Sequence, residues 1–509
     1  MWYPWVWAYF TTLLCSHYPR VRLGGTSIIG KHLRSYNQDF FGGIPFAEPP
    51  TASFRFAPPQ LKLSLVPSRS FDARSYGPSC LQLENMSEDC LTLNIFRPSG
   101  IDSLASLPVM VWIYGDGQSS IYDGSYFVEQ SVARGTPILF VSLNYRVGPL
   151  GFPQGPEAAE RAVLNLGLHD QWAALEWVQS NIASFGGDPA KVCSPTITSA
   201  QSLITRNQRL LSLGRVQGRC PLHTTTSTEN FTAVARAAIF QSGVGSTLPI
   251  FNAYRGTPSW MLFANNTKSC MALTLSPDST FSCLMSASPS DLLVGTRAGM
   301  AIELFPFRPV LDGNEGVISD QPVKRLARGA GQRVPFIAGT VLDEATMFLQ
   351  RDFQTEDITT WLNANFTPSP VGPDALRTGL DKLLSLYPDD PSAGSPFGTG
   401  NQTFGTGPGF KRGSAIIGDI YFQALRRFWS QTTSALGTPS YAYIFTDPQP
   451  SDDPALGVSH DSELPYLFSD VSKNGPPNSA RLSRAMLDYW ISFAVSLTPN
   501  DGKGTQRML

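Results

Sequence analysis

The chain has 509 residues, enough to bury a large core as one elaborated domain or as two or three smaller ones. Its formal net charge is −2, and basic patches with interleaved aromatic residues are absent, so neither nucleic acid nor an anionic membrane is expected as a partner. The 44 glycines and 41 prolines imply many turns and long loops, as in an enzyme whose site is built from loops.

Residues 1–20 form a possible signal segment. Residues 2–15 are apolar but too short to span a bilayer, no Lys or Arg precedes them and no Ala-x-Ala site follows. A misplaced start codon or a buried first strand is the alternative. Export is favoured by five Asn-x-Ser/Thr sequons, at Asn85, Asn230, Asn265, Asn365 and Asn401. No other stretch suits a membrane span, so we expect a secreted protein with residues 21–509 as a single domain.

The seven cysteines include two pairs at short separations. Cys80 and Cys90 bracket a short polar loop, and so do Cys270 and Cys283. Both spacings suit local disulfides, and the absence of His or further Cys nearby argues against zinc. The cysteines left over are Cys15, Cys193 and Cys220.

In the first part of the chain, short strand-like pieces occupy residues 21–23 and 26–30. The Pro-rich segments 41–50 and 55–60 predict surface loops, because proline cannot sit in a central strand. Residues 88–96 alternate apolar and polar side chains, which indicates a half-buried strand.

Unbroken apolar runs at residues 109–114 and 138–145 are typical of strands covered on both faces. Apolar residues between 168 and 182 recur at spacings of four and three, which predicts an amphipathic helix. Further strand-like and helix-like segments follow at residues 234–243, 334–339, 416–429, 440–445 and 478–494, the last opening with Asn478 and Ser479 as capping candidates. This alternation favours an α/β domain with a large, mostly parallel central sheet flanked by helices.

Residues 193–230 break the pattern. No helical or strand period holds there, and Arg206, Arg209, Arg215 and Arg219 fall close together. This segment therefore resembles sequence foreign to the rest of the chain, which a misread intron or a frame slip would produce.

Several phrases together resemble the type-B carboxylesterase and lipase family, which includes cholinesterases and secreted fungal lipases. Those phrases are Gly43–Pro50, Ser87–Ile95, Asn144–Gly148, Asn165–Gln171, Phe185–Pro189 and Gln241–Gly243. The resemblance covers roughly residues 21–502 except 193–230, and it is closest to the secreted fungal lipase-like branch. It implies an α/β-hydrolase fold and acyl transfer to water through a serine, a glutamate and a histidine, in that chain order.

The resemblance points to Glu344 and His460 as the acid and the histidine. His460 lies in the phrase Gly457–Leu464, which matches the family's histidine loop, whereas a surface histidine would be the alternative for an isolated one. Glu344 directly follows a strand, in a phrase where Ala345 replaces the family's glycine. A helix cap is the alternative there, and Asp343 suits that role better.

The nucleophile segment departs from the family. Gly-x-Ser-x-Gly is missing, and Ser199, followed by Ala200, is the serine with the right neighbour. The oxyanion hole is expected from the backbone N–H groups of Asp116, Gly117 and Ala200. A carboxylate at Asp116 would raise the barrier beside a developing oxyanion.

The leading hypothesis is a serine ester hydrolase acting on a small-molecule or lipid ester, with no cofactor and no metal. The alternatives are a catalytically impaired or non-catalytic binding or adhesion protein of the same family, and a damaged gene model. The chain stops at Leu509, where relatives continue, so its C-terminus looks truncated. No oligomeric state is predicted.

Overall fold

The structure is a computed structural model. It describes residues 18–65, 70–82, 86–115, 122–197, 234–245, 247, 249–271, 276–301, 303, 305–313, 316–329, 334–369, 371–448, 453–469, 471 and 478–504.

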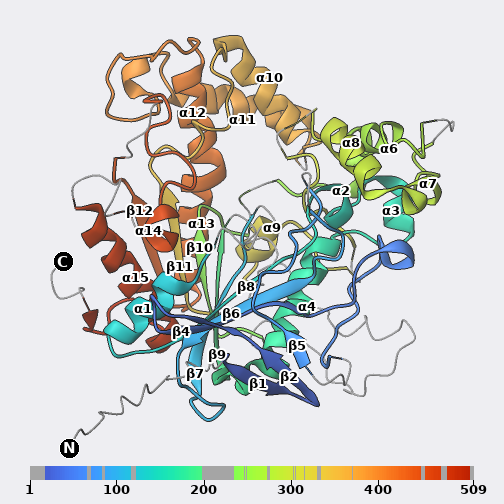
Figure 1. The fold of residues 1–509 in the computed structure, drawn as a ribbon. Coiled ribbons are helices and arrows are strands. Elements are labelled where there is room, and N and C mark those ends of the chain that lie inside the picture. Colours follow the sequence, from blue (N-terminus) through green and yellow to red (C-terminus); the bar gives the residue numbers. More distant parts are fainter. Residues whose placement is uncertain are drawn as a thin grey trace, which may run out of the picture.

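A nine-stranded sheet forms the centre of the described part of the chain, in the order β12-β11-β10-β9-β7-β8-β6-β4-β3 (Figure 1). Its strands are β3 (Lys31–Leu33), β4 (Gln38–Pro45), β6 (Thr92–Pro98), β7 (Leu107–Trp112), β8 (Leu139–Leu143), β9 (Gly187–Ile197), β10 (Ala237–Gln241), β11 (Phe336–Val341) and β12 (Ser440–Phe445). The pairings from β8 to β12 are parallel, and those among β3, β4, β6 and β8 are antiparallel. A second, three-stranded sheet contains β1 (Arg20–Leu23), β2 (Thr26–Ile29) and β5 (Ser70–Asp72). The predicted α/β fold with a large, mostly parallel sheet is confirmed.

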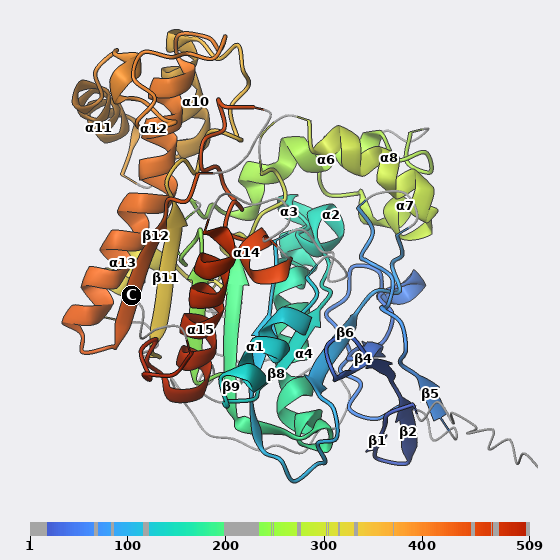
Figure 2. The ribbon, with the colours of Figure 1, turned by 60° about the vertical axis from the view of Figure 1, so that its left-hand side comes forward.

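Helices cover both faces of this sheet (Figure 2). Alternate residues of β10 separate the two sides: Ala237 and Ile239 pack in the cluster that contains Trp490, whereas Ala238 and Phe240 pack with Trp429. The helices are α1 (Ser125–Ala133), α2 (Gly148–Gly151), α3 (Gly155–Glu160), α4 (Leu166–Asn181), α6 (Thr257–Asn265), α7 (Phe281–Ser286), α8 (Pro289–Gly299), α9 (Pro322–Ala327), α10 (Thr355–Phe366), α11 (Pro373–Leu386), α12 (Phe410–Gly418), α13 (Ala424–Ala435), α14 (Pro465–Phe468) and α15 (Ser479–Ser496).

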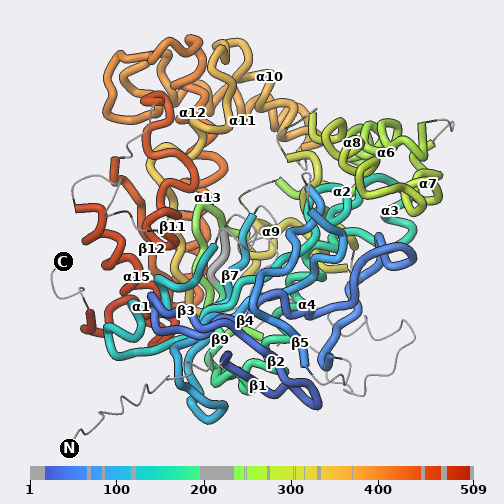
Figure 3. Tube along the Cα trace, viewed as in Figure 1, coloured from blue at the N-terminus to red at the C-terminus, as the bar shows by residue number. Residues whose placement is uncertain are grey.

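Two groups of helices lie beyond the same end of the central sheet (Figure 3). One group contains α6, α7 and α8, and the other contains α10, α11 and α12. Each group has its own buried cluster of apolar side chains. β11 and the other parallel strands end at the edge of the sheet that lies between the two helix groups. The loops that carry the candidate site leave the sheet at this edge.

Several local predictions are corrected by the structure. The segment 41–50 is not entirely a loop, because β4 runs through Pro45 and pairs with β6. The strand expected at 88–96 begins only at Thr92, and as β6 it is buried along its whole length, not half-buried. Its polar Asn94 is accommodated because the amide donates to Ser142 Oγ (3.2 Å) and accepts from Gly43 N (3.0 Å).

The helix predictions also need correction. Helix α4 is buried on nearly all sides and is not amphipathic, since its polar Asp170 pairs with buried Arg146 at 2.7 Å. The predicted helix 416–429 is α12 and α13 joined by a π-helical turn at Asp419–Gln423. Asn478 precedes α15 with φ of 77° and its side chain makes no capping hydrogen bond.

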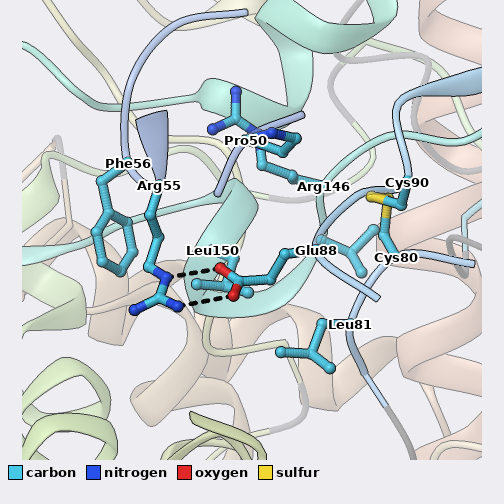
Figure 4. Close-up of a pocket in the computed structure, with 10 residues that line it drawn as sticks. Pro50, Arg55, Phe56, Cys80, Leu81, Glu88, Cys90, Arg146 and Leu150 are labelled. Atoms are coloured by element: carbon cyan, nitrogen blue, oxygen red, sulfur yellow. Dashed lines mark hydrogen bonds and ion pairs between the residues drawn. A yellow bond between two sulfur atoms is a disulfide. The ribbon is translucent and has the colours of Figure 1, made fainter. Parts of the chain in front are cut away.

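The phrase Ser87–Ile95 has a structural role. Glu88 and Arg55 form a buried bidentate ion pair at 2.6 and 2.7 Å, beside the Cys80–Cys90 disulfide (Figure 4). The same guanidinium donates to the carbonyls of Leu284, Met285 and Ala287. Arg55 thus ties the first disulfide loop to α7, which carries a cysteine of the second.

Candidate active site

The topology brings the predicted site segments to one edge of the sheet. Parallel strands end on the same side, and in open α/β sheets ligands bind beyond these carboxyl ends. Glu344 follows the end of β11 by three residues, and His460 lies on the loop after the neighbouring β12. Strand β7 leads to Gly115, and its neighbour β9 ends at Ile197, the last described residue of that segment.

Glu344 and His460 form a buried hydrogen-bonded pair. The Glu344 Oε2 to His460 Nδ1 distance is 2.6 Å, and the two residues are 1% and 8% exposed. The other carboxylate oxygen, Oε1, accepts from the backbone N of Val341 at 2.9 Å. With both oxygens engaged, the carboxylate is fixed, and it holds the imidazole with Nε2 as the nitrogen left for chemistry.

Asp343 joins the two loops that carry this pair. Its Oδ2 accepts from Val458 N (2.9 Å), and its Oδ1 accepts from Ser395 Oγ (2.7 Å) and Phe397 N (2.8 Å). It is buried and no helix begins at it, so the alternative role as a helix cap does not apply. Gly457 lies close against it with φ of 59°, where an added Cβ would meet Asp343 Oδ2 at 2.5 Å, so this position requires glycine.

Burial and three carboxylates act on the imidazole in opposite directions. Burial by itself would lower the pKa of His460, but the charge and hydrogen bond of Glu344, with the charges of Asp461 and Glu463, outweigh it and raise the pKa to about 9. The Asp461 carboxylate lies 3.5 Å from Nε2, on the side of the ring away from Glu344. The imidazolium is therefore favoured, and the neutral base forms at alkaline pH.

Glu463 is a buried acid that sequence reasoning did not identify. Its Oε1 accepts from Gln241 Nε2 (3.2 Å), whose Oε1 in turn accepts from Trp490 Nε1 (3.0 Å). Burial, followed by the charge of Glu344, raises the pKa of Glu463 to about 7. Its place three residues after His460 was the signal in the sequence that could have revealed it.

Two phenylalanine rings pack against the imidazole. The ring centroid of His460 lies 5.1 Å from that of Phe348 and 5.3 Å from that of Phe422. Phe348 follows Glu344 by one helical turn's length, whereas Phe422 comes from the distant π-helical turn and left no signal in the sequence. These rings restrict the orientation of the imidazole and shield its face from water.

A cavity of about 390 Å³ opens at this pair, within the size range of small-molecule sites. His460, Asp461 and Gly115 lie in its wall, with Phe348 and Phe422. The remaining lining is mostly apolar and includes Tyr122, Tyr145, Val147, Phe152, Leu168, Met300, Phe305, Phe307 and Met347. The arrangement can accept an apolar molecule beside a base whose second nitrogen is already oriented.

Four predicted site residues, Ser199, Ala200, Asp116 and Gly117, lie outside the described residues. Of the other histidines in the described part of the chain, His32 lies away from the Glu344–His460 pair and interacts with Asp39 and Ser99. His169 is in α4.

The four predicted disulfide cysteines are joined as Cys80–Cys90 and Cys270–Cys283. Cys193, in β9, is a buried free thiol whose pKa burial raises to about 12, so it stays protonated. In the part of the chain that the structure describes, no group of three or more His, Cys, Asp or Glu side chains could hold a metal ion. Nor does any helix there have the length and apolar character needed to cross a membrane.

The sequence and the fold are both similar to those of known proteins. The profile of the Carboxylesterase family matches residues 18–196 and 213–508. The chain is 34% identical to Lipase 2 of Geotrichum candidum, over 95% of this chain and 88% of that protein. It is 33% identical to Secreted lipase 1 of Botryotinia fuckeliana (strain B05.10), over 91% and 82%.

The fold is also that of a solved structure. The crystal structure of Aspergillus niger EstA matches with a TM-score of 0.77 and 24% identity, over 96% of this chain and 90% of that one. The family match is interrupted only at residues 197–212, inside the segment whose pattern breaks down. The chain belongs to the carboxylesterase family, and its relatives support its assignment as a carboxylic ester hydrolase.

Proposed function

We propose that the protein hydrolyses carboxylic esters through Ser199, His460 and Glu344, with an acyl-serine intermediate. The observation that carries this proposal is the 2.6 Å contact between His460 Nδ1 and Glu344 Oε2 at the wall of the 390 Å³ cavity. A fixed carboxylate on one imidazole nitrogen prepares the other to act as general base.

In the proposed first step, Ser199 Oγ attacks the ester carbonyl carbon while His460 Nε2 takes the hydroxyl proton. The carbon–oxygen bond to the alcohol then breaks, and the departing alkoxide receives that proton from the imidazolium. Water repeats the sequence on the acyl-serine and releases the carboxylic acid. Glu344 stabilises the imidazolium in both steps and keeps its own charge. Backbone N–H groups of Asp116, Gly117 and Ala200 are the proposed donors to the oxyanion.

We also propose that the protein is secreted and that its substrate is a small-molecule or lipid ester. The relatives named above include a secreted lipase, two disulfides join cysteines of this chain, and five sequons are present. Disulfides persist in oxidising, extracellular surroundings.

Labelling with a fluorophosphonate probe tests the nucleophile. The wild-type chain is expected to be labelled, and Ser199→Ala is expected to lose the label, with the modified peptide identified by mass spectrometry. His460→Ala should strongly slow labelling, and Asp374→Asn, an exposed change on α11, serves as the matched control. Labelling that survives Ser199→Ala would assign the nucleophile elsewhere. Absence of labelling would favour a non-catalytic member, and sequencing the transcript across codons 190–235 would then show whether the segment itself is misread.

A further inference from the structure

The cavity contains an arginine that the proposed ester chemistry does not use. Arg308 lies in its wall together with His460, and it is only 7% exposed. Among the described residues, its guanidinium has one polar partner, Glu303 Oε2, at 3.5 Å. That distance is the outer limit of a hydrogen bond, so the guanidinium retains unused donors. Its neighbours Glu303, Arg255 and Phe251 line a second, smaller hollow, which shares Pro306, Arg308 and Pro309 with the cavity.

Glu303 is already engaged by a second arginine. Arg255 donates to its two oxygens at 3.3 and 2.9 Å, closer than Arg308. Two guanidinium groups thus share one carboxylate, and this cluster has an excess positive charge. Burial lowers the pKa of Arg308, but a guanidinium remains charged at any physiological pH.

The other neighbours of Arg308 do not neutralise it. The ring of Phe251 lies 5.3 Å from its guanidinium carbon and 5.6 Å from that of Arg255. The Tyr421 hydroxyl is buried without a hydrogen-bond partner in the described part of the chain, and burial raises its pKa, so it is neutral. A buried charge is costly without a strong partner, so this site favours an anion supplied from the cavity.

Aromatic rings connect His460 to the segment that carries Arg308. Phe348 packs against His460, and Phe305, three residues before Arg308, packs against Phe348 at 5.7 Å. Asp461 lies beside His460 and would repel an anion from the imidazole. The charges therefore favour an ester whose neutral scissile group lies at His460 and whose anionic group lies at Arg308.

We propose that the cavity binds esters carrying a carboxylate remote from the scissile bond, and that Arg308 is the residue that selects it. The alternative is a purely structural arginine held by Glu303 and Phe251. Glu303 separates the two, because it competes with the substrate's carboxylate for the same guanidinium. Neutralising Glu303 strengthens anion binding if Arg308 selects the substrate. If Arg308 is purely structural, neutralising Glu303 only lowers the stability of the fold.

Because this proposal rests on the ester hydrolase function proposed above, binding is measured apart from turnover. The probes are non-hydrolysable anilide analogues of an ester, 5-(4-nitroanilino)-5-oxopentanoate and its neutral terminal amide, titrated by calorimetry at pH 7. A second pair, 4-(butyrylamino)benzoate and 4-(butyrylamino)benzamide, carries the charge on the alcohol side. Each pair differs only in charge, so the ratio of dissociation constants isolates the effect of the carboxylate.

We expect the wild-type protein to bind the anion of at least one pair about tenfold or more tightly than its amide, as for a charge-assisted hydrogen bond. Arg308→Gln should bring that ratio close to one, and Glu303→Gln should increase it. A wild-type ratio near one in both pairs, a ratio in Arg308→Gln within twofold of wild type, or a decrease in Glu303→Gln would overturn the proposal. Thermal unfolding of each variant verifies folding, and Glu303→Gln keeps the test decisive if Arg308→Gln does not fold. Failure of turnover with this binding pattern intact would refute only the ester hydrolase function.

Discussion

Replacing Asp461 by asparagine is expected to make the enzyme faster at neutral pH. The carboxylate lies 3.5 Å from His460 Nε2, and its side chain is 45% exposed whereas that of His460 is 7% exposed, so full screening by water sets the lower bound of the effect. Coulomb's law at that distance gives about 1.2 kcal/mol, which lowers the pKa of His460 by about 0.9 when the charge is removed. From a starting pKa of about 9, the neutral fraction of the imidazole at pH 7 rises from about 1% to about 7%.

The assay is kcat/KM for 4-nitrophenyl butyrate between pH 6 and 10.5, which reports the pKa of the base in the free enzyme. The wild-type rate should rise with pH and level off above about 9, because only the neutral imidazole accepts the proton. Asp461→Asn should be about sevenfold faster at pH 7 and equal to wild type at pH 10. Asp374→Asn, an exposed carboxylate on α11, should leave the profile unchanged.

Two results would refute this reasoning. A wild-type profile that levels off below pH 7.5 would mean that the carboxylates do not hold the imidazolium. An Asp461→Asn profile with the wild-type midpoint would mean that Asp461 is screened from Nε2, and Glu344 alone would then set the pKa.

Three further predictions concern stability and positioning. Since the pKa of His460 is raised, its pair with Glu344 contributes stability that is complete below pH 6.5 and is lost as pH rises through about 9. The raised pKa of Glu463 likewise makes stability fall between about pH 4.5 and 7. The urea midpoint of unfolding should therefore decrease from pH 5 to 10, and a flat profile would contradict this. Glu88→Gln leaves the buried charge of Arg55 without its carboxylate and should cost about 3–5 kcal/mol of unfolding free energy, against less than about 1 for the surface pair in Glu48→Gln. Asp343→Asn should reduce kcat at least tenfold and move the midpoint of the pH–rate profile, whereas a purely structural role would lower the melting temperature and leave that midpoint in place.

The sequence predicted the sheet, and it singled out Glu344 and His460, which the structure places in contact, but it was less informative about their surroundings. Unbroken apolar runs such as 109–114 are typical of strands covered on both faces, and β7 and β8 are buried there as expected. Helix α4 was assigned the wrong character because its period is real but its polar Asp170 faces buried Arg146. That partner lies 24 residues away, and a local pattern carries no information about it.

The residues that tune the site were missed for the same reason. Asp343 was interpreted by its immediate neighbours, whereas its hydrogen bonds come from Ser395, Phe397 and Val458. Phe422 reaches His460 only because a π-helical turn and the loop after β12 meet at the sheet edge. Pairings between distant segments are fixed by the tertiary fold, and a single sequence displays only their separate ends.

The charges around the cavity also constrain how a substrate can lie in it. Glu344, Asp461 and Glu463 surround the imidazole, so the site stabilises the imidazolium both before and during proton transfer. The ground state is stabilised as well as the transition state, and only interactions that strengthen in the transition state accelerate the reaction. An ester bound with a carboxylate at Arg308 would keep its own charge away from that end, where an oxyanion must develop. Selection at Arg308 therefore orients the substrate without adding negative charge at the reacting carbon.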